Sequence, residues 1–204
     1  MRNGDSRAAL LAAALVAMIA LCLSVAPWAG ARAHWPRGAQ ILVWIDPAGA
    51  PTGGDVLVER AMQAWTDAAA GRFSLSRSGT RDAAAVRVHF FRDDYRYGVT
   101  SPRLDERTGA IAEAEVAVAA DPAGDDLTKR IVWYLTALHE LGHALGLPHS
   151  ADFDDIMYLF RMPGDGVRYF RQYRNRLGAT GDVGVTASGL SAADTRAIRE
   201  LYDR

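Results

Sequence analysis

Residues 139–150 read His-Glu-Leu-Gly-His-Ala-Leu-Gly-Leu-Pro-His-Ser. On an α-helix, two residues that are four apart are separated by about 6 Å along the axis and about 40° around it. His139 and His143 therefore share one face of a helix, and both imidazole rings can reach a single Zn²⁺ ion at about 2 Å. His149 comes six residues after His143, where the same helix could not present it. The stretch predicts a helix that carries two metal ligands and ends before the third.

The segment between the second and third histidines contains residues that end a helix. Gly146 can adopt the left-handed conformation that closes a helix, and Pro148 prevents the helix from resuming. The chain can then turn so that His149 faces the metal. Three protein ligands leave one position of a tetrahedral Zn²⁺ ion open for water, which is typical of a catalytic zinc site rather than a structural one.

The residue after the first histidine carries the predicted chemistry. Glu140 points to the side of the two ligands, where its carboxylate can hold a water at the metal instead of binding the metal itself. A carboxylate in that place can act as a general base. A site that only stored a metal would gain nothing from such a base, so Glu140 favours catalysis.

The apolar pattern around this stretch predicts an α/β (α+β) domain with helices packed on a twisted mixed sheet. Three helices are expected: an active-site helix that starts at Asp125 or Asp126, a second packing helix between Asp55 and Gly71, and a C-terminal helix capped by Ser191. Strands are expected at 41–45, 73–76, 85–91 and 111–118. The segments 92–109 and 150–189 are expected to be irregular.

The N-terminal segment has the features of an export signal. Arg2 and Arg7 precede the apolar run 8–26, and small residues at Ala31 and Ala33 suit a cleavage site. We expect a signal peptide at 1–33, a catalytic domain at 34–204, and a secreted or periplasmic bacterial protein without a stable membrane span. The alternative is an N-terminal membrane anchor, since the run is nearly long enough to span a bilayer.

Composition limits the partners that the chain can have. The 204 residues carry a formal net charge of −1, and half of them are hydrophobic, so we expect a monomeric globular domain that does not bind nucleic acid. The acidic residues Asp93, Asp94, Asp105 and Glu106 could bind Ca²⁺. The alternative is a solvated acidic loop. His89 is expected to be a structural or surface residue.

The sequence resembles the metzincins, and among them the matrixins. The resemblance rests on the motif from His139 to His149, on Ser150, on residues 155–158 (Asp-Ile-Met-Tyr), and on residues 190–194 (Leu-Ser-Ala-Ala-Asp). It implies a zincin fold and one catalytic Zn²⁺ ion. It also implies an endopeptidase that hydrolyses peptide bonds of proteins or peptides by a Glu-assisted zinc-water mechanism.

The resemblance also assigns roles outside the motif. It places Met157 beneath the metal as a hydrophobic floor and ties Asp194 of the last helix to the turn that carries Met157. It makes the strand at 111–118 the sheet edge along which a substrate would pair. The connection between Met157 and Leu190 would wall the pocket for the side chain just after the cleaved bond, and its aromatic and arginine residues predict a preference for large apolar or acidic side chains there.

Two other classes of function stay open at this point. One is a catalytically inactive zinc-binding protease homologue that acts as a binding module. The other is a metallohydrolase that acts on an amide other than a peptide bond.

Overall fold

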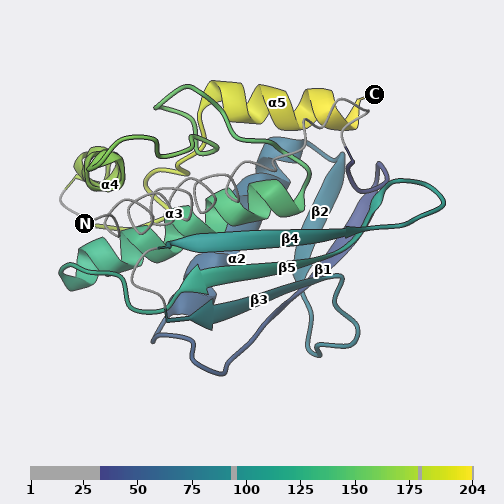
Figure 1. Ribbon diagram of the computed structural model, residues 1–204, viewed down its shortest axis with the longest axis horizontal. Coiled ribbons are helices and arrows are strands. Elements are labelled where there is room, and N and C mark those ends of the chain that lie inside the picture. The colour runs from purple at the N-terminus through teal and green to yellow at the C-terminus, as the bar shows by residue number, and fades with distance from the viewer. Residues whose placement is uncertain (1–32, 93–95, 179–180, 204) are drawn as a thin grey trace, which may run out of the picture. The chain divides into compact units, whose positions relative to one another are not determined.

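The computed structural model describes residues 33–92, 96–178 and 181–203, and in these residues a five-stranded sheet supports four helices (Figure 1). The strand order is β2-β1-β3-β5-β4, in which β4 is antiparallel to β5 and the other neighbours are parallel. The strands are β1 (Ala39–Ile45), β2 (Phe73–Arg77), β3 (Val86–Phe91), β4 (Gly98–Leu104) and β5 (Ile111–Ala119). The helices are α2 (Gly54–Ala69), α3 (Asp126–Ala144), α4 (Asp165–Arg176) and α5 (Ala192–Tyr202).

One face of the sheet forms the core with α2 and α3. Val43, Val88 and Val116, from the three central strands, are all fully buried, and α2 and α3 pack against each other and against the strands. The opposite face is more polar, because Arg87 of β3 pairs there with Glu113 and Glu115 of β5. This arrangement confirms the predicted α/β class, with a mixed sheet and helices packed on it.

Helix α3 begins and ends where the sequence predicts. The Asp125 side chain accepts a hydrogen bond from the backbone N–H of Thr128 at 2.8 Å, which caps the first turn. At the other end Gly146 has a φ of 100°, and a Cβ added there would clash with the backbone oxygen of Ala33. Both the conformation and the lack of space therefore require glycine at 146.

Two tryptophans hold α3 in place from outside the helix. The indole N–H of Trp65 on α2 donates to the Leu138 carbonyl at 2.8 Å, and that of Trp35 donates to the Ala144 carbonyl at 2.8 Å. Both indole rings are buried, so these bonds form in a region from which water is excluded. They fix the position of the turns that carry the metal-binding motif.

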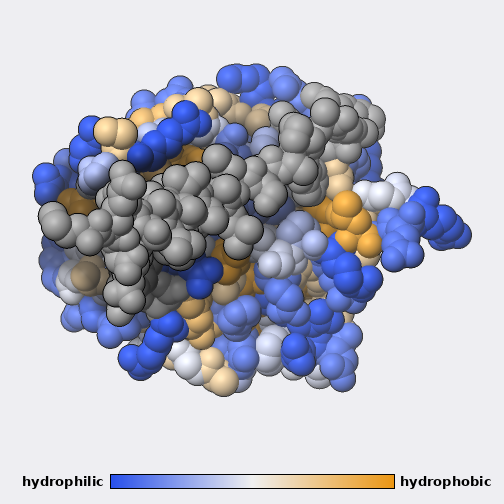
Figure 2. All heavy atoms as spheres, in the orientation of Figure 1, coloured by the Kyte–Doolittle hydropathy of each residue, from blue (hydrophilic) through white to orange (hydrophobic). Residues whose placement is uncertain are grey.

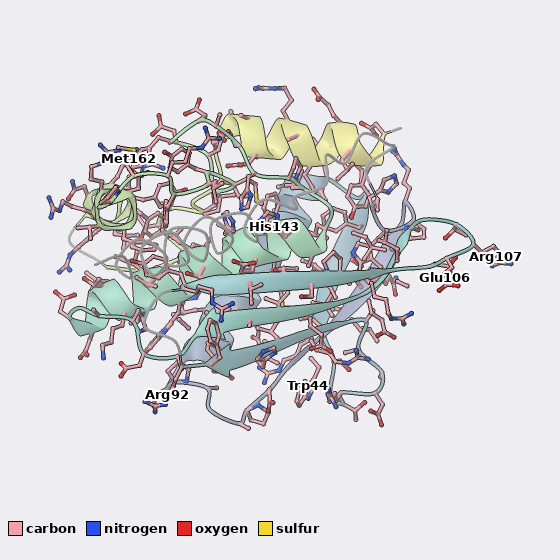
Figure 3. The ribbon with its side chains drawn as sticks, viewed as in Figure 1. Trp44, Arg92, Glu106, Arg107, His143 and Met162 are labelled. Atoms are coloured by element: carbon pink, nitrogen blue, oxygen red, sulfur yellow. The ribbon has the colours of Figure 1, made fainter. Side chains whose placement is uncertain are left out.

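The segment 92–109 is not irregular, as its sequence suggested, because residues 98–104 form β4. This strand lies at the edge of the sheet, where proline and polar residues are tolerated. Most of its side chains are exposed, so it lacks the apolar alternation that identifies a half-buried strand. The turn between β4 and β5 is hydrophilic and carries Glu106 and Arg107 at its tip (Figures 2 and 3).

The expected substrate edge is also corrected. β5, which contains the segment 111–118, lies between β3 and β4 and has neighbours on both sides. Among the described residues, the strand at this edge of the sheet is β4, and β2 lies at the opposite edge. The resemblance was applied to the segment 111–118 because residues 98–104, which form the edge strand, were not predicted to be a strand.

The connection 150–189, also expected to be irregular, contains the helix α4. Its buried aromatic residues Tyr169, Phe170 and Tyr173 have helical spacing. Arginine and glutamine side chains lie between and beside them in the sequence and obscure this apolar pattern. The buried Asp165 in its first turn accepts hydrogen bonds from the backbone N–H groups of Arg161 and Met162, both at 2.9 Å. This carboxylate fixes the chain as it enters α4.

Of the predicted signal peptide 1–33, only Ala33 falls within the described residues. The signal peptide and its cleavage site therefore stay predictions. Among the described residues, no helix is long and apolar enough to cross a membrane.

Candidate metal centre and active site

The structure brings the three predicted histidine ligands together. The ring centroids of His139, His143 and His149 lie 4.5–5.4 Å apart, and one ring nitrogen from each falls within 4.8 Å of the others. The Nε2 atoms of His143 and His149 are 3.1 Å apart. Two nitrogens bound to one tetrahedral zinc at about 2.0–2.1 Å would be separated by about 3.3 Å. The cluster therefore fits a zinc ion, and it is the only such group among the described residues.

Backbone carbonyls orient the two helical histidines. Nδ1 of His139 lies 2.6 Å from the Ile156 carbonyl oxygen, and Nδ1 of His143 lies 2.8 Å from that of Leu147. A carbonyl oxygen only accepts hydrogen bonds, so each Nδ1 carries the proton and each Nε2 is left with a lone pair for a metal. Figure 3 shows His143 on α3.

The surroundings keep these rings in the neutral form that binds a metal. Burial lowers the pKa of His139 to about 3 and that of His143 to about 4. The pKa of His149 is lowered by burial and by the nearby charge of Arg161. Neutral imidazole is the ligand form, so no proton has to be displaced from these rings at neutral pH.

Glu140 lies in the same site with its carboxylate buried. Its pKa is raised by burial to about 7, against the opposing effect of a hydrogen bond from Thr100. The hydroxyl of Thr100 lies 2.7 Å from Oε2 of Glu140. This pKa of Glu140 is that of the metal-free site, and the charge of a bound zinc ion would lower it.

Met157 packs against the part of α3 that carries the two helical histidines, which agrees with the place that the resemblance implied. Its buried side chain packs on the backbone of Gly142, which lies between the two helical histidines, and a Cβ at 142 would clash with the sulfur. The Asp194 carboxylate accepts a hydrogen bond from the Ile156 N–H at 2.8 Å. The link between the last helix and this turn is therefore confirmed.

A network of polar side chains connects α5 to Ser150, the residue after the third histidine. Ser150 and Ser191 each donate a hydroxyl hydrogen bond to the Asp155 carboxylate, at 2.6 and 2.7 Å. Ser191 in turn caps α5 together with Asp194. The network joins the segment after His149 to α5, which holds the carbonyl of Ile156 in position for His139.

A pocket of about 570 Å³ opens beside the histidines and Glu140. Residues 96–100 form one side and α3 forms another, while the remaining wall comes from the connection after Met157. This wall includes Phe160, Tyr169 and Phe170, and the Tyr97 ring packs edge-on against Phe170 at a centroid distance of 5.0 Å. The predicted pocket wall is thus present, and it is aromatic.

Two of the arginines predicted at the pocket rim, Arg168 and Arg174, have other contacts. Arg174 pairs with Asp125 at 2.9 Å. Arg168 pairs with Asp165 at 3.3 Å and its guanidinium lies over the Phe153 ring. The arginine that lines the pocket is Arg96, which the sequence reasoning did not select.

The other candidate residues that the structure describes lie outside this site. Oδ1 of Asp105 accepts hydrogen bonds from the backbone N–H groups of Arg107 and Thr108 and from the Thr108 hydroxyl, so it closes the turn between β4 and β5. Asp93 and Asp94 fall outside the described residues. His89 lies on β3 and faces the more exposed side of the sheet, as expected for a structural or surface histidine.

Sequence reasoning missed the contribution of β4 to the site. Gly98 and Thr100 both contact Glu140, and neither was a candidate, because their segment was expected to be irregular. The β-branched pair Val99-Thr100 was the available signal. It is too short to predict a strand by itself.

Comparison with known proteins agrees with the geometry. The sequence profile of the matrixin family matches residues 51–168. The chain belongs to the matrixin family. The matched range contains the whole motif, Met157 and the start of α4.

Three curated relatives of this matrixin are similar over part of its length. Macrophage metalloelastase of Oryctolagus cuniculus is 28% identical over 71% of this chain and 28% of its own length. Interstitial collagenase of the same species is 31% identical over 51% of this chain and 23% of its own. Matrilysin of Felis catus is 38% identical over 33% of this chain and 19% of its own. The matches thus span about a quarter of the length of these relatives.

Proposed function

We propose that this matrixin is an exported zinc-dependent endopeptidase, with His139, His143 and His149 as zinc ligands and Glu140 as the general base. The observation that carries the proposal is the convergence of three imidazole nitrogens beside a buried carboxyl group at an open pocket. Three protein ligands suit a catalytic zinc site, which keeps one position open.

The residues of the chain divide the reaction between them. Zn²⁺ held by the three histidines supplies a Lewis acid for water and for the carbonyl of the bond to be cut. Glu140 accepts a proton from the attacking water and then gives it to the departing amine.

The free edge of β4 offers a place for an extended peptide. β5 pairs with one side of β4, and no strand of the described residues pairs with its other side. The backbone N–H and C=O groups of that side could bind a further strand. Residues 96–100, which include the first part of β4, also line the pocket beside Glu140. A peptide paired there would bring a backbone carbonyl close to the base.

The experiment that tests this function is digestion of a mixed peptide library by the purified domain 34–204, with products identified by mass spectrometry. We expect internal cleavages that a zinc chelator abolishes and that added zinc restores. Tight zinc binding without any cleavage would favour the inactive homologue, and hydrolysis of small amides without peptide cleavage would favour the other metallohydrolase. Calcium binding by the acidic residues near β4 stays a separate prediction.

The aromatic pocket predicts a large apolar side chain just after the cleaved bond. Tyr97 is half-exposed, and its ring packs edge-on against Phe160 and Phe170. Tyr97→Ala should therefore widen the pocket without exposing the hydrophobic core. We expect the library profile to shift toward larger side chains at that position, while zinc content stays the same.

The matched control is Val167→Ala, an exposed position on α4 that does not line the pocket. It should leave the profile unchanged. A Tyr97→Ala profile identical to that of the parent would show that the aromatic wall does not select the substrate.

Export is tested by N-terminal sequencing of the protein recovered from its native compartment. The apolar run 8–26 and the Ala31-Arg32-Ala33 site predict a mature chain that begins at His34. A chain that still begins at Met1 would instead support the membrane-anchored alternative.

A further inference from the structure

We propose that Thr100 is a positioning residue, whose hydroxyl fixes the carboxylate of Glu140 for proton transfer. This inference rests on the proposed function of Glu140 as the general base. It assigns to the side chains of β4 a role in catalysis beside the backbone pairing of that strand.

The contact between the two residues is direct. Oγ1 of Thr100 lies 2.7 Å from Oε2 of Glu140 and 2.9 Å from the backbone carbonyl oxygen of the same residue. A hydroxyl has one proton and can donate it to one acceptor at a time. The carboxylate oxygen is the nearer of the two acceptors, so the hydroxyl donates to Oε2.

A second residue of β4 confines the carboxylate from another side. A Cβ added to Gly98 would lie 2.7 Å from Cγ and from Oε1 of Glu140, and 2.7 Å from the Thr136 methyl carbon. The Gly98 backbone therefore packs closely on the glutamate side chain. Gly98 and Thr100 are two residues apart, so both face Glu140 from the same side of the strand.

These contacts leave the buried carboxylate one well-defined position. Val116 of β5 pairs with Thr100 in the ladder, so the strand that holds the glutamate is itself held by the sheet. A peptide on the free edge of β4 would be placed by the same strand. The same strand would then position both the substrate and the base. Their relative position matters because a misplacement of the reacting groups by about 1 Å can lower the rate about 100-fold.

The test compares Thr100→Val, which removes the hydroxyl and keeps the shape, with Thr100→Ser, which keeps the hydroxyl. We expect Thr100→Val to lower kcat about 10- to 100-fold with little change in KM, because the loss falls on proton transfer and not on peptide binding. Thr100→Ser should restore kcat to within about threefold of the parent. Zinc content should be equal in all three proteins.

The matched control is Thr66→Val. Thr66 on α2 is also half-buried, and its hydroxyl accepts a hydrogen bond from the Leu75 N–H at 3.0 Å, away from the site. This variant measures what loss of a threonine hydroxyl costs through stability alone, and its kcat should match that of the parent. A kcat for Thr100→Val within twofold of the parent, or an equal loss in Thr100→Val and Thr100→Ser, would overturn the inference.

A crystal structure of Thr100→Val gives a readout that does not depend on activity. We expect the Glu140 carboxylate to leave its position or to occupy more than one rotamer, whereas the parent has one. An unchanged carboxylate would overturn the inference even if kcat fell. Should the zinc-loaded parent cut no peptide, the proposed function would fail, and this structure would still decide whether Thr100 fixes Glu140.

Discussion

Replacement of Glu140 by alanine is expected to lower kcat for peptide cleavage by about 10⁴-fold while the protein keeps its zinc. The loss is large because one carboxylate serves both proton transfers, and removal of a general base alone costs about 10² to 10⁴ in rate. Zinc is retained because the metal-binding group consists of His139, His143 and His149. Activity is measured on a peptide found in the library digest, and zinc by elemental analysis of the same sample.

Two further variants make this result specific. Glu140→Gln keeps the shape and can still accept the Thr100 hydrogen bond, yet it cannot take a proton, so it should be as inactive as Glu140→Ala. Glu200→Ala changes an exposed glutamate on α5 and should be fully active. Near-normal activity of Glu140→Ala would show that another group is the base.

His149→Ala is expected to weaken zinc binding by more than about 100-fold, since it removes one of three protein ligands. His149 is the most exposed of the three histidines, although its ring is partly shielded from water, and it lies outside any helix. Its loss should therefore affect the metal much more than the fold. The affinity is measured by competition with a coloured chelator, and the fold by thermal unfolding of the metal-free protein.

His89→Ala is the control for this experiment. His89 lies on β3, away from the histidine cluster, and its replacement should leave the zinc affinity unchanged. If His149→Ala bound zinc as tightly as the parent, His149 would not be a ligand and the assigned donor set would be wrong.

The metal centre could be predicted because its geometry is local. The spacing of His139 and His143 fixes their common face on any helix, and Gly146 marks the point at which the chain must turn toward His149. The structure has this turn, with Gly146 at a φ of 100°. The core helices were predictable for a related reason, since their apolar residues repeat at the period of a helix.

The contribution of β4 to the surroundings of the metal centre could not be predicted, because it depends on distant contacts. β4 is an edge strand, so its sequence is largely polar, and only its pairing with β5 defines it. The contact of Thr100 with Glu140 depends on that pairing. Helix α4 shows a similar limit. The aromatic wall of the pocket was predicted, but the helix that carries Tyr169 and Phe170 was not, because the polar residues around them obscure the helical spacing.

The central claim, that three histidines hold zinc beside Glu140, is tested most directly by anomalous diffraction at the zinc absorption edge from crystals of the domain 34–204. We predict a single strong peak where the ring nitrogens of His139, His143 and His149 converge, with no protein ligand beyond these three. A strong zinc peak at other residues, or no peak at this cluster in crystals of a zinc-loaded and peptide-cleaving sample, would contradict the account.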